Sequence, residues 1–541
     1  MITRLAPKCL FLTLAIASWP PAWSQVSILT GQYDTTRASA NLSETSLTTS
    51  NVNTTQFGLL FTRAVDDFMY AQPLYLPQVT IAGGKHNVVY AATLNNSVYA
   101  FDADTAGLPA PLWQVNLGPV APQKSADLPR CGILSTPVID PSSATMYVVA
   151  LTKQSGTESF GLHALDITSG AEKFGGPVTV KASVKGTGAQ SHGGVIRFNA
   201  AGLLQRPALL LFNGAVYMGF AKHRSNADYP YHGWVLGYNA ATLHQSYVLN
   251  TTPNGSTGGV WMSGRGPVAD TQGFTFITGD GDVGNSDIGE SFARIGTNHS
   301  LLGLFTAPNW QTLNANDFDL GSGGPLLIPG TSLLVGGGKT GTLYLLSITS
   351  AGALQLMQTL QATPGCSSNT SSSCAEIHST AYWNRTGADP LFYLWASSDV
   401  LKAFSFIGGL LSASPVSQNS LTSSFPGGAL AISANGSAAG TGILWAAMPT
   451  MSASTMAVPG ILHAYDASNV ATELWNSTMN AADNLGDLAK FVVPVVDNGK
   501  VYMSTFSNQL AVYGLKSGSL RIAKAAPGVG ALRQRPAAVQ P

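Results

Sequence analysis

A two-part strand pattern recurs eight times along this chain, and the repetition constrains its fold more than any other feature. The first part is a short strand that is entered through a proline or glycine and left through a turn. The second part is a pair of strands bounded by Gly, Asn and Asp. The copies are spaced roughly 50 to 70 residues apart, which indicates a repeat architecture. Copies of the first part begin at Gln72, Ser135, Gln205, Gly264, Ser322, His378, Gly427 and Val492.

Each repeat has about four strands, and a sheet of that size does not bury both of its faces alone. Eight such sheets closed in a ring bury these faces and leave only short, protected edges. The sequence therefore predicts an all-β protein, an eight-bladed β-propeller of four-stranded blades that spans residues 56–515 as one domain. A β-sandwich or a β-helix is the alternative, but four strands in so long a repeat argue against both.

The two ends of the chain have a different composition from the repeats. Arg4 and Lys8 precede a short apolar run with a small-residue exit at Ser24, which is typical of a signal peptide over residues 1–24. Neither this run nor any later segment is long and apolar enough to span a membrane. We therefore expect an exported protein, periplasmic or extracellular. Residues 25–55 form a polar lead, and residues 516–541 are expected to be a disordered tail.

The charge balance and the cysteines exclude several classes of function. Charged residues make up only 10% of the chain, and without the leader its net charge is about −2, so there is no basic surface for nucleic acid. Cys366 and Cys374 bracket a polar loop and are expected to form a disulfide in an oxidising compartment. Cys131 is then either buried or facing a site. No CxxCH motif is present for a c-type haem, and no CxxC pair suggests zinc.

One glycine-rich stretch, residues 316–346, combines carboxylates with a lysine. Asp317 and Asp319 precede a short apolar strand, and Lys339 follows twenty positions after Asp319, once the chain has doubled back. This order would bring a base and a cation to one end of a small sheet. A pair of Asx-turn residues and a solvated lysine in a hairpin would explain the same pattern.

Polar residues also stand directly before the first strand of several repeats. In a propeller this strand lines the central channel, so these residues crowd one of its mouths. Taken singly, each of them is explained by the need to satisfy backbone groups at a water-filled channel. They include Gln72, Ser135, Gln205, Arg206, Arg265 and His378.

The second part of the repeat often ends in an aromatic residue or Leu, then Asp, a turn and a later Trp. Residues 100–118, 163–178 and 463–477 show this order. These segments resemble the tryptophan-docking repeats of the pyrroloquinoline quinone (PQQ) dehydrogenases, the eight-bladed quinoproteins. The resemblance covers nearly the whole chain after the leader and implies the same fold. It implies the activity less strongly, since such repeats also occur in non-catalytic propellers.

Several segments of this chain resemble parts of the family's active-site pattern. Asp317-Phe318-Asp319 and the run from Lys339 to Leu346 look like the catalytic aspartate and its basic partner, so the resemblance implies Asp319 as base and Lys339 as electrostatic partner. Gly258-Gly259-Val260-Trp261 is similar to the segment that floors the quinone with a tryptophan. Arg265, Gln205, Arg206 and His378 are expected at the mouth, where Arg265 especially would pair with quinone carboxylates.

The resemblance also implies a calcium site. Thr278-Gly279-Asp280 is similar to a family Thr-Gly-Asn in which the Asn ligates calcium, and Asp228 stands near the expected place of a ligating Glu, just before Tyr231-His232-Gly233. Both expected ligands differ in type or length from the family's. The vicinal cysteine pair of many members is absent, and Cys131 lies in that neighbourhood, so we expect it near the quinone.

The sequence therefore supports an exported quinoprotein-like propeller. The leading hypothesis is a PQQ- and calcium-dependent dehydrogenase that oxidises an alcohol or sugar by hydride transfer to the quinone, with an electron acceptor as its partner. The alternative is a non-catalytic secreted propeller that acts as a binding or scaffolding module, because fold alone does not fix function. A hydrolase or lyase that uses Asp319 and His378 on a polysaccharide has no specific motif and ranks last.

Overall fold

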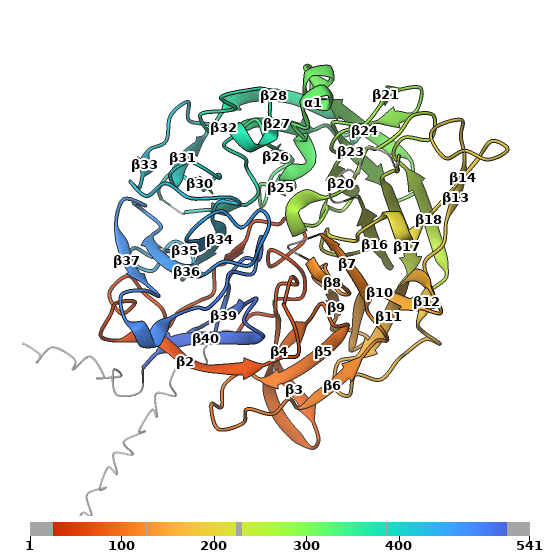
Figure 1. Ribbon diagram of the computed structural model, residues 1–541. Helices are drawn as coiled ribbons and strands as arrows, with labels where there is room; N and C mark the ends of the chain where they lie inside the picture. The colour runs from red at the N-terminus through yellow and green to blue at the C-terminus, as the bar shows by residue number, and fades with distance from the viewer. Residues whose placement is uncertain (1–24, 126–127, 223–229, 386, 517–541) are drawn as a thin grey trace, which may run out of the picture.

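Eight antiparallel sheets stand side by side in a ring around a central channel (Figure 1). The structure is a computed structural model that describes residues 25–125, 128–222, 230–385 and 387–516. The expected leader and all but the first residue of the expected tail lie outside these residues. The prediction of an all-β, eight-bladed propeller with four-stranded blades is confirmed.

The blades follow one another around the ring in chain order. Blade 1 has β3 (Leu74–Ile81), β4 (Gly84–Ala92), β5 (Ser97–Asp102) and β6 (Trp113–Asn116), and blade 2 has β9 (Val138–Asp140), β10 (Thr145–Gln154), β11 (Thr157–Asp166) and β12 (Val178–Thr179). Blade 3 has β15 (Leu210–Phe212), β16 (Ala215–Phe220), β17 (Trp234–Asn239) and β18 (Gln245–Asn250). Blade 4 has β19 (Val268–Ala269), β20 (Gly273–Ile277), β23 (Ser291–Gly296) and β24 (Leu301–Thr306).

The second half of the ring repeats the same order. Blade 5 has β25 (Leu326–Leu327), β26 (Leu333–Gly337), β27 (Thr342–Ile348) and β28 (Leu354–Gln361). Blade 6 has β29 (Thr380–Trp383), β30 (Leu391–Leu394), β31 (Lys402–Ile407) and β32 (Leu410–Leu411), with β33 (Ser417–Gln418) also on β31. Blade 7 has β34 (Ala429–Ser433), β35 (Ile443–Pro449), β36 (Gly460–Asp466) and β37 (Glu473–Asn476), and blade 8 has β38 (Val495–Asp497), β39 (Lys500–Ser504) and β40 (Gln509–Leu515).

Short elements connect the blades. Three hairpins form two-stranded sheets separate from the blades: β7 (Ala121–Ser125) with β8 (Leu128–Cys131), β13 (Ser183–Lys185) with β14 (Val195–Arg197), and β21 (Val283–Gly284) with β22 (Asp287–Ile288). The helical elements of the described residues are α1 (Trp310–Asn316) and the short 3₁₀ turns η1 (Ala200–Gly202), η2 (Met262–Gly264), η3 (Leu320–Ser322), η4 (Ser371–Ser373) and η5 (Ala481–Asp483).

The ring is closed by a strand from the beginning of the chain. β2 (Phe57–Ala64) pairs antiparallel with β40, with Leu59 opposite Tyr513, and so completes blade 8 as its outer strand. Apolar side chains fill the space between adjacent blades. Trp113 on the outer strand of blade 1 also donates from its indole nitrogen to the carbonyl of Ile167 in blade 2, at 2.9 Å. Burial and cross-blade hydrogen bonds together hold the blades in register.

The polar lead runs inside the ring before it reaches β2. β1 (Ala40–Asn41) pairs in parallel with β34, the innermost strand of blade 7. Upstream of it, Ile28 forms a bridge to Tyr75 in blade 1, and Ala269 in blade 4 donates to Thr35. Further bonds join Leu29 to Ile139, Arg37 to Leu209, Thr36 to Leu327, Ala38 to Tyr382 and Tyr33 to Pro494. This single segment therefore contacts the innermost strand, or the residue just before it, of every blade and fills one end of the channel.

Candidate active site at the channel mouth

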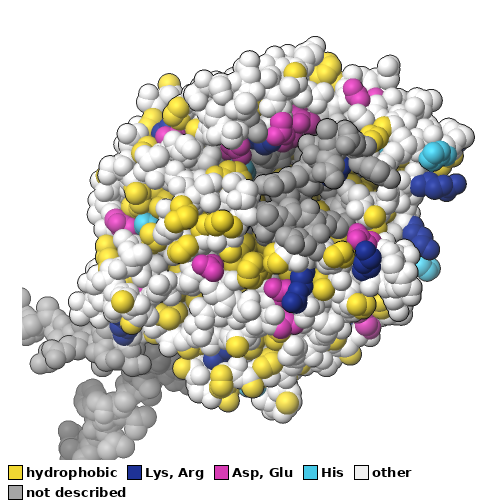
Figure 2. All heavy atoms as spheres, in the orientation of Figure 1, with side chains coloured by type: hydrophobic (Ala, Val, Ile, Leu, Met, Phe, Trp, Pro, Cys, Tyr) yellow, Lys and Arg dark blue, Asp and Glu magenta, His cyan; other side chains and the backbone are white. Residues whose placement is uncertain are grey.

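A cavity of about 640 Å³ is lined by residues that belong to, or connect, blades 3 to 8. Figure 2 shows acidic and basic side chains gathered at the upper rim of the central hollow. Of the residues singled out from the sequence, six line this cavity: Trp261, Asp280, Asp317, Asp319, Lys339 and His378. A volume of this size is in the range of small-molecule and cofactor sites.

The glycine-rich stretch brings Asp319 and Lys339 together as it doubles back. α1 ends where Asp317 takes a left-handed conformation, with φ 57°, and Asp319 immediately precedes η3. After β26 the chain returns, and the backbone nitrogen of Lys339 donates to the carbonyl oxygen of Asp319 at 3.1 Å. The left-handed turn and this backbone contact set the positions of both side chains at the cavity rim.

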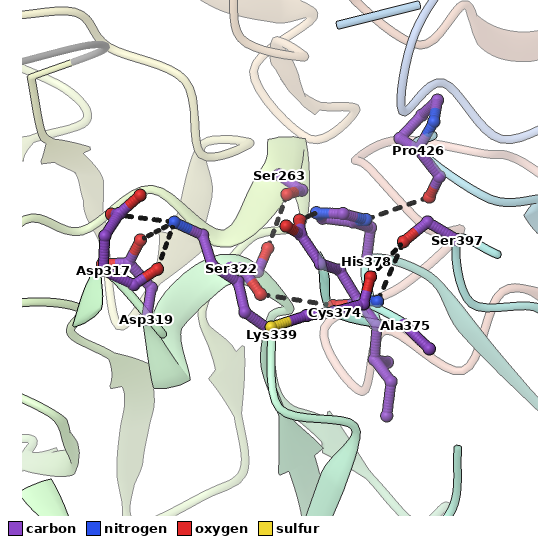
Figure 3. Close-up of polar contacts among 12 residues, drawn as sticks. Ser263, Asp317, Asp319, Ser322, Lys339, Cys374, Ala375, His378, Ser397 and Pro426 are labelled. Atoms are coloured by element: carbon purple, nitrogen blue, oxygen red, sulfur yellow. Dashed lines mark hydrogen bonds and ion pairs between the residues drawn. The ribbon is translucent and has the colours of Figure 1, made fainter. Parts of the chain in front are cut away.

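The Lys339 ammonium bridges the two aspartates (Figure 3). Its Nζ lies 2.6 Å from Oδ2 of Asp319 and 2.9 Å from Oδ1 of Asp317. Burial alone would raise the pKa of Asp319, but the Lys339 charge outweighs it and holds that pKa below its usual value. Burial likewise opposes protonation of Lys339, yet the two carboxylates raise its pKa. Asp319 is therefore an ionised carboxylate at neutral pH.

Asp319 also belongs to a cluster of three carboxylates. One oxygen from each of Asp280, Glu290 and Asp319 lies within 4.8 Å of the others. The backbone nitrogen of Asp280 donates to Oδ1 of Asp319 at 2.9 Å, and that of Leu320 donates to Oε2 of Glu290 at 2.7 Å. A glycine is required at residue 279, because a Cβ there would collide with the Asp319 carboxylate. Local steric crowding therefore explains the glycine of the Thr-Gly-Asp motif.

Two buried oxygens of the cluster have no hydrogen-bond donor among the described residues when Asp280 and Glu290 are both ionised. Oδ1 of Asp280 and Oε1 of Glu290 are buried and have no hydrogen-bond partner among the described residues. Burial and the charge of Asp319 raise the pKa of Asp280 to about 10 and that of Glu290 to about 8. Crowded buried carboxylates must be neutralised either by protons or by a cation. Oxygen ligands of this kind suit a hard cation such as calcium.

Glu290 was missed by the sequence analysis. It stands directly before β23, with a positive φ of 45°, and its side chain is fully buried. The available signal was a carboxylate between Gly289 and the start of an apolar strand, ten residues after Asp280. A glutamate at a strand start is usually solvated, so this signal was too weak to distinguish it from a surface residue.

Trp261 is half-buried in the cavity wall, beside Tyr231. The chain turns sharply after it, since Met262 and Ser263 both have positive φ angles, 49° and 44°. Ser263 fixes this turn by donating from Oγ to the carbonyl of Ser322 at 2.5 Å (Figure 3). Burial and then the charge of Asp319 raise the pKa of Tyr231, so its hydroxyl stays protonated. An indole and a phenol therefore face the same space as the carboxylates.

Arg265, Arg206 and Gln205 do not line the cavity. Arg265 is buried and donates from Nη1 to the carbonyl of Thr380 at 2.8 Å and from Nη2 to that of Arg37 at 2.6 Å. Arg206 donates to the carbonyl of Leu134, and Gln205 to that of Pro207. Burial lowers the pKa of Arg265 to about 9 and that of Arg206 to about 10. In the described residues these groups hold backbone segments together around the channel.

The remaining expected ligands have different surroundings. His378 lines the cavity, with Nδ1 2.9 Å from the carbonyl of Pro426 and Nε2 3.0 Å from Oε2 of Glu376. Cys131 ends β8 and is buried in an apolar cluster that also includes residues of blades 2 and 3. Asp228 lies outside the described residues. The predicted disulfide between Cys366 and Cys374 is confirmed, and Cys374 reaches the cavity wall.

The fold is that of solved quinoprotein dehydrogenases. The chain is similar to quinohemoprotein alcohol dehydrogenase from Comamonas testosteroni, with a TM-score of 0.58 and 12% identity over 94% of this chain and 82% of that one. A quinohemoprotein alcohol dehydrogenase from Pseudomonas putida HK5 gives a TM-score of 0.51 and 14% identity over 95% and 82% of the two chains. A europium-containing methanol dehydrogenase gives 0.55 and 12% over 90% and 98%.

At this level of identity the likeness shows the architecture. No family model and no curated protein sequence matches the chain. In the described part of the chain, no helix has the length and apolar character needed to cross a membrane. The activity therefore has to be argued from the site itself.

Proposed function

We propose that this protein is an exported dehydrogenase that binds PQQ and a calcium ion in the cavity and oxidises an alcohol or a sugar. The observation that carries this proposal is the cluster of buried Glu290 with half-buried Asp280 and Asp319, beside Lys339 and open to a cavity that Trp261 also lines. The quinoprotein architecture of the neighbours supports it.

The carboxylate cluster fits a hard cation. Asp280 and Glu290 each contribute a buried oxygen without a hydrogen-bond partner among the described residues. Calcium takes six to eight oxygen ligands, so these oxygens and Asp319 would provide part of the shell. A cation would also offset the repulsion that otherwise keeps Asp280 and Glu290 protonated. One of the similar structures is described as containing europium, itself a hard cation.

The cavity fits a flat anionic cofactor. Trp261 offers an apolar ring at the wall, suited to stacking with a planar ring system. Lys490 lines the cavity, and the Arg206 guanidinium lies behind it, 5.7 Å from the ring of Phe491. The Lys490 charge would favour a bound carboxylate, whereas the buried Arg206 does not reach the cavity. When bound, the quinone would supply the two-electron oxidising capacity that this reaction needs.

Asp319 is suited to act as the base. Its low pKa keeps the carboxylate ionised, and Lys339 fixes the orientation of Oδ2. An alcohol hydroxyl held at this carboxylate would give up its proton to it as the carbinol carbon is oxidised. The half-buried wall of Trp261 and Tyr231 would limit water at this point.

Calorimetric titration of purified, metal-stripped protein with PQQ, with and without calcium, tests the proposal. Tight binding of one quinone that depends on calcium is the expected result, followed by dye-linked oxidation of alcohols or sugars. If no quinone binds even at high concentration with calcium present, the dehydrogenase proposal is wrong. The propeller would then be a binding module.

A further inference from the structure

The cavity has a second wall, opposite in character to the carboxylate cluster, which we call the serine–aromatic wall. It consists of Glu376, Ser398, Phe425, Ser452, Lys490 and Phe491. These residues come from the loops before and within blades 6, 7 and 8, whereas the carboxylate cluster belongs to blades 4 and 5. The proposed proton transfer uses none of them, although the charge of Lys490 is also proposed to favour a quinone carboxylate.

Three polar side chains of this wall, Glu376, Ser398 and Ser452, can offer hydrogen bonds to a ligand. His378 holds the Glu376 carboxylate through Oε2, and the other oxygen has no partner among the described residues. Ser398 and Ser452 are exposed, and the described part of the chain offers no hydrogen-bond partner to either hydroxyl. A carboxylate and two hydroxyls therefore present acceptors and donors to the cavity.

The apolar part of the wall consists of two aromatic rings. Phe425 and Phe491 are half-buried, and their ring centroids lie 6.1 Å apart at an interplanar angle of 88°. His378 packs against both, at 5.4 and 5.0 Å between centroids. Rings placed beside hydrogen-bonding groups suit a ligand with both C–H faces and hydroxyls.

The charged and polar groups around the rings disfavour two other classes of ligand. Lys490 Nζ lies 5.8 Å from the ring of Phe425 and 5.6 Å from that of Phe491, so it would repel a cationic ligand from these faces. A simple hydrocarbon alcohol would remove water from Glu376, Ser398 and Ser452 without replacing its hydrogen bonds. A neutral ligand rich in hydroxyl groups meets both requirements.

We propose that the serine–aromatic wall is a subsite for a polyhydroxylated substrate, a monosaccharide or a cyclic polyol. The subsite deepens the proposed function and rests on it, because the carbinol to be oxidised would lie at Asp319 while the remaining hydroxyls bind here. A site built to bond substrate hydroxyls discriminates strongly against analogues that lack them. The substrate class is thereby narrowed from alcohols in general to sugars and cyclic polyols.

The test measures binding without quinone, by calorimetry and saturation-transfer NMR, with D-glucose, myo-inositol and cyclohexanol as probes. We expect glucose or inositol to bind at least about tenfold more tightly than cyclohexanol, as two or more additional hydrogen bonds would give. Glu376→Gln and the double variant Ser398→Ala/Ser452→Ala should each weaken polyol binding by about fivefold or more. The matched control is Ser414→Ala/Ser420→Ala, which removes two exposed hydroxyls that do not line the cavity.

The outcomes separate this inference from the proposed function. Cyclohexanol binding as tightly as both polyols, or polyol binding unchanged in both wall variants, overturns the subsite. The serine variant keeps the test valid if the Glu376 variant misfolds. Its two hydroxyls bond to no other described residue, so their removal should leave the fold unchanged. Polyol binding that follows these variants in a protein that never binds PQQ would support the subsite and overturn the dehydrogenase. Quinone-dependent oxidation of simple alcohols with no preference for polyols would support the dehydrogenase and overturn the subsite.

Discussion

Lys339 holds its ammonium nitrogen 2.6 Å from Oδ2 of Asp319, at the rim of the cavity. The other oxygen of the same carboxylate accepts a backbone hydrogen bond from Asp280. Asp319 is thus fixed from two sides and belongs to two systems, an ion pair with a lysine and a cluster with two further carboxylates. Removing the lysine would raise the pKa of Asp319, whereas removing the two other carboxylates would lower it. The two roles of Asp319 are therefore separable by experiment.

Asp319→Asn should abolish dye-linked oxidation and leave the fold intact. An amide does not accept the substrate proton at neutral pH, and loss of a general base costs roughly 10²- to 10⁴-fold in rate. The measurement is kcat with PQQ and calcium at saturating concentrations. The matched control is Asp282→Asn, whose carboxylate accepts from the backbone of Ser256 and does not line the cavity. If Asp319→Asn oxidises normally while Asp317→Asn does not, the base is Asp317.

Lys339→Gln should move the acid limb of the rate profile to higher pH. Without the ammonium, burial dominates and raises the pKa of Asp319, so the base ionises only at a higher pH. We expect a displacement of about one pH unit or more. Lys339→Arg retains the positive charge and should keep the limb near its original position. An unchanged profile in Lys339→Gln would show that Asp319 does not control the rate.

The blades were predictable because each one repeats the same local signals. Alternating apolar residues and turn residues recur in every copy, so errors in single copies do not change the architecture. The proximity of Asp319 and Lys339 was predictable for a similar reason, since both lie on one segment that doubles back. Glu290 was not found, because its place in the cluster depends on contacts with Asp280 and with Leu320, which is thirty residues away in the sequence.

The arginines show a second reason why part of the site could not be predicted from the sequence. Arg206 and Arg265 were correctly placed near the innermost strands, but whether a guanidinium faces the channel or the backbone depends on the segment that fills the channel. Arg265 donates to the carbonyl of Arg37, a residue of the polar lead. Nothing in the composition of residues 25–55 indicated that they would thread through the ring. Such long-range packing has no periodic signature in the sequence.

Glu290→Gln should weaken calcium binding by about tenfold or more, because it removes one charged oxygen ligand from the cluster. Isothermal titration of the metal-stripped protein measures the loss. Without calcium, the same variant should be about as stable as the wild type at neutral pH, since burial and the charge of Asp319 raise the pKa of Glu290 to about 8 and its protonated carboxyl is already neutral, like the amide. Glu172→Gln, remote from the cavity and paired with His163, is the control for a lost glutamate. Equal calcium affinity in Glu290→Gln and the wild type would contradict a metal at this cluster.

Asp497→Asn should remove a pH-dependent loss of stability. Asp497 ends β38 beside the polar lead, where its Oδ1 accepts from Val26 and Asn41 and its Oδ2 is buried without a hydrogen-bond partner in the described residues. Burial and then the charge of Glu44, against the bond from Val26, raise its pKa to about 7. The folded protein therefore holds this proton where the unfolded chain has released it, so the stabilisation is complete below about pH 4 and is lost as the pH rises through 7.

The measurement is the free energy of unfolding by urea at pH 5.5 and 8.5, for the wild type and the variant. We expect the wild type to lose about 1 to 3 kcal/mol more than Asp497→Asn between these two values. Asp140→Asn is a contrasting control, because hydrogen bonds from Ser142 and Ser143 hold the pKa of Asp140 below its usual value, against burial. Its curve should run parallel to that of the wild type over this range. Parallel curves for Asp497→Asn would show that Asp497 is ionised in the folded state across the whole interval, and that the contact of the lead with blade 8 does not depend on its proton.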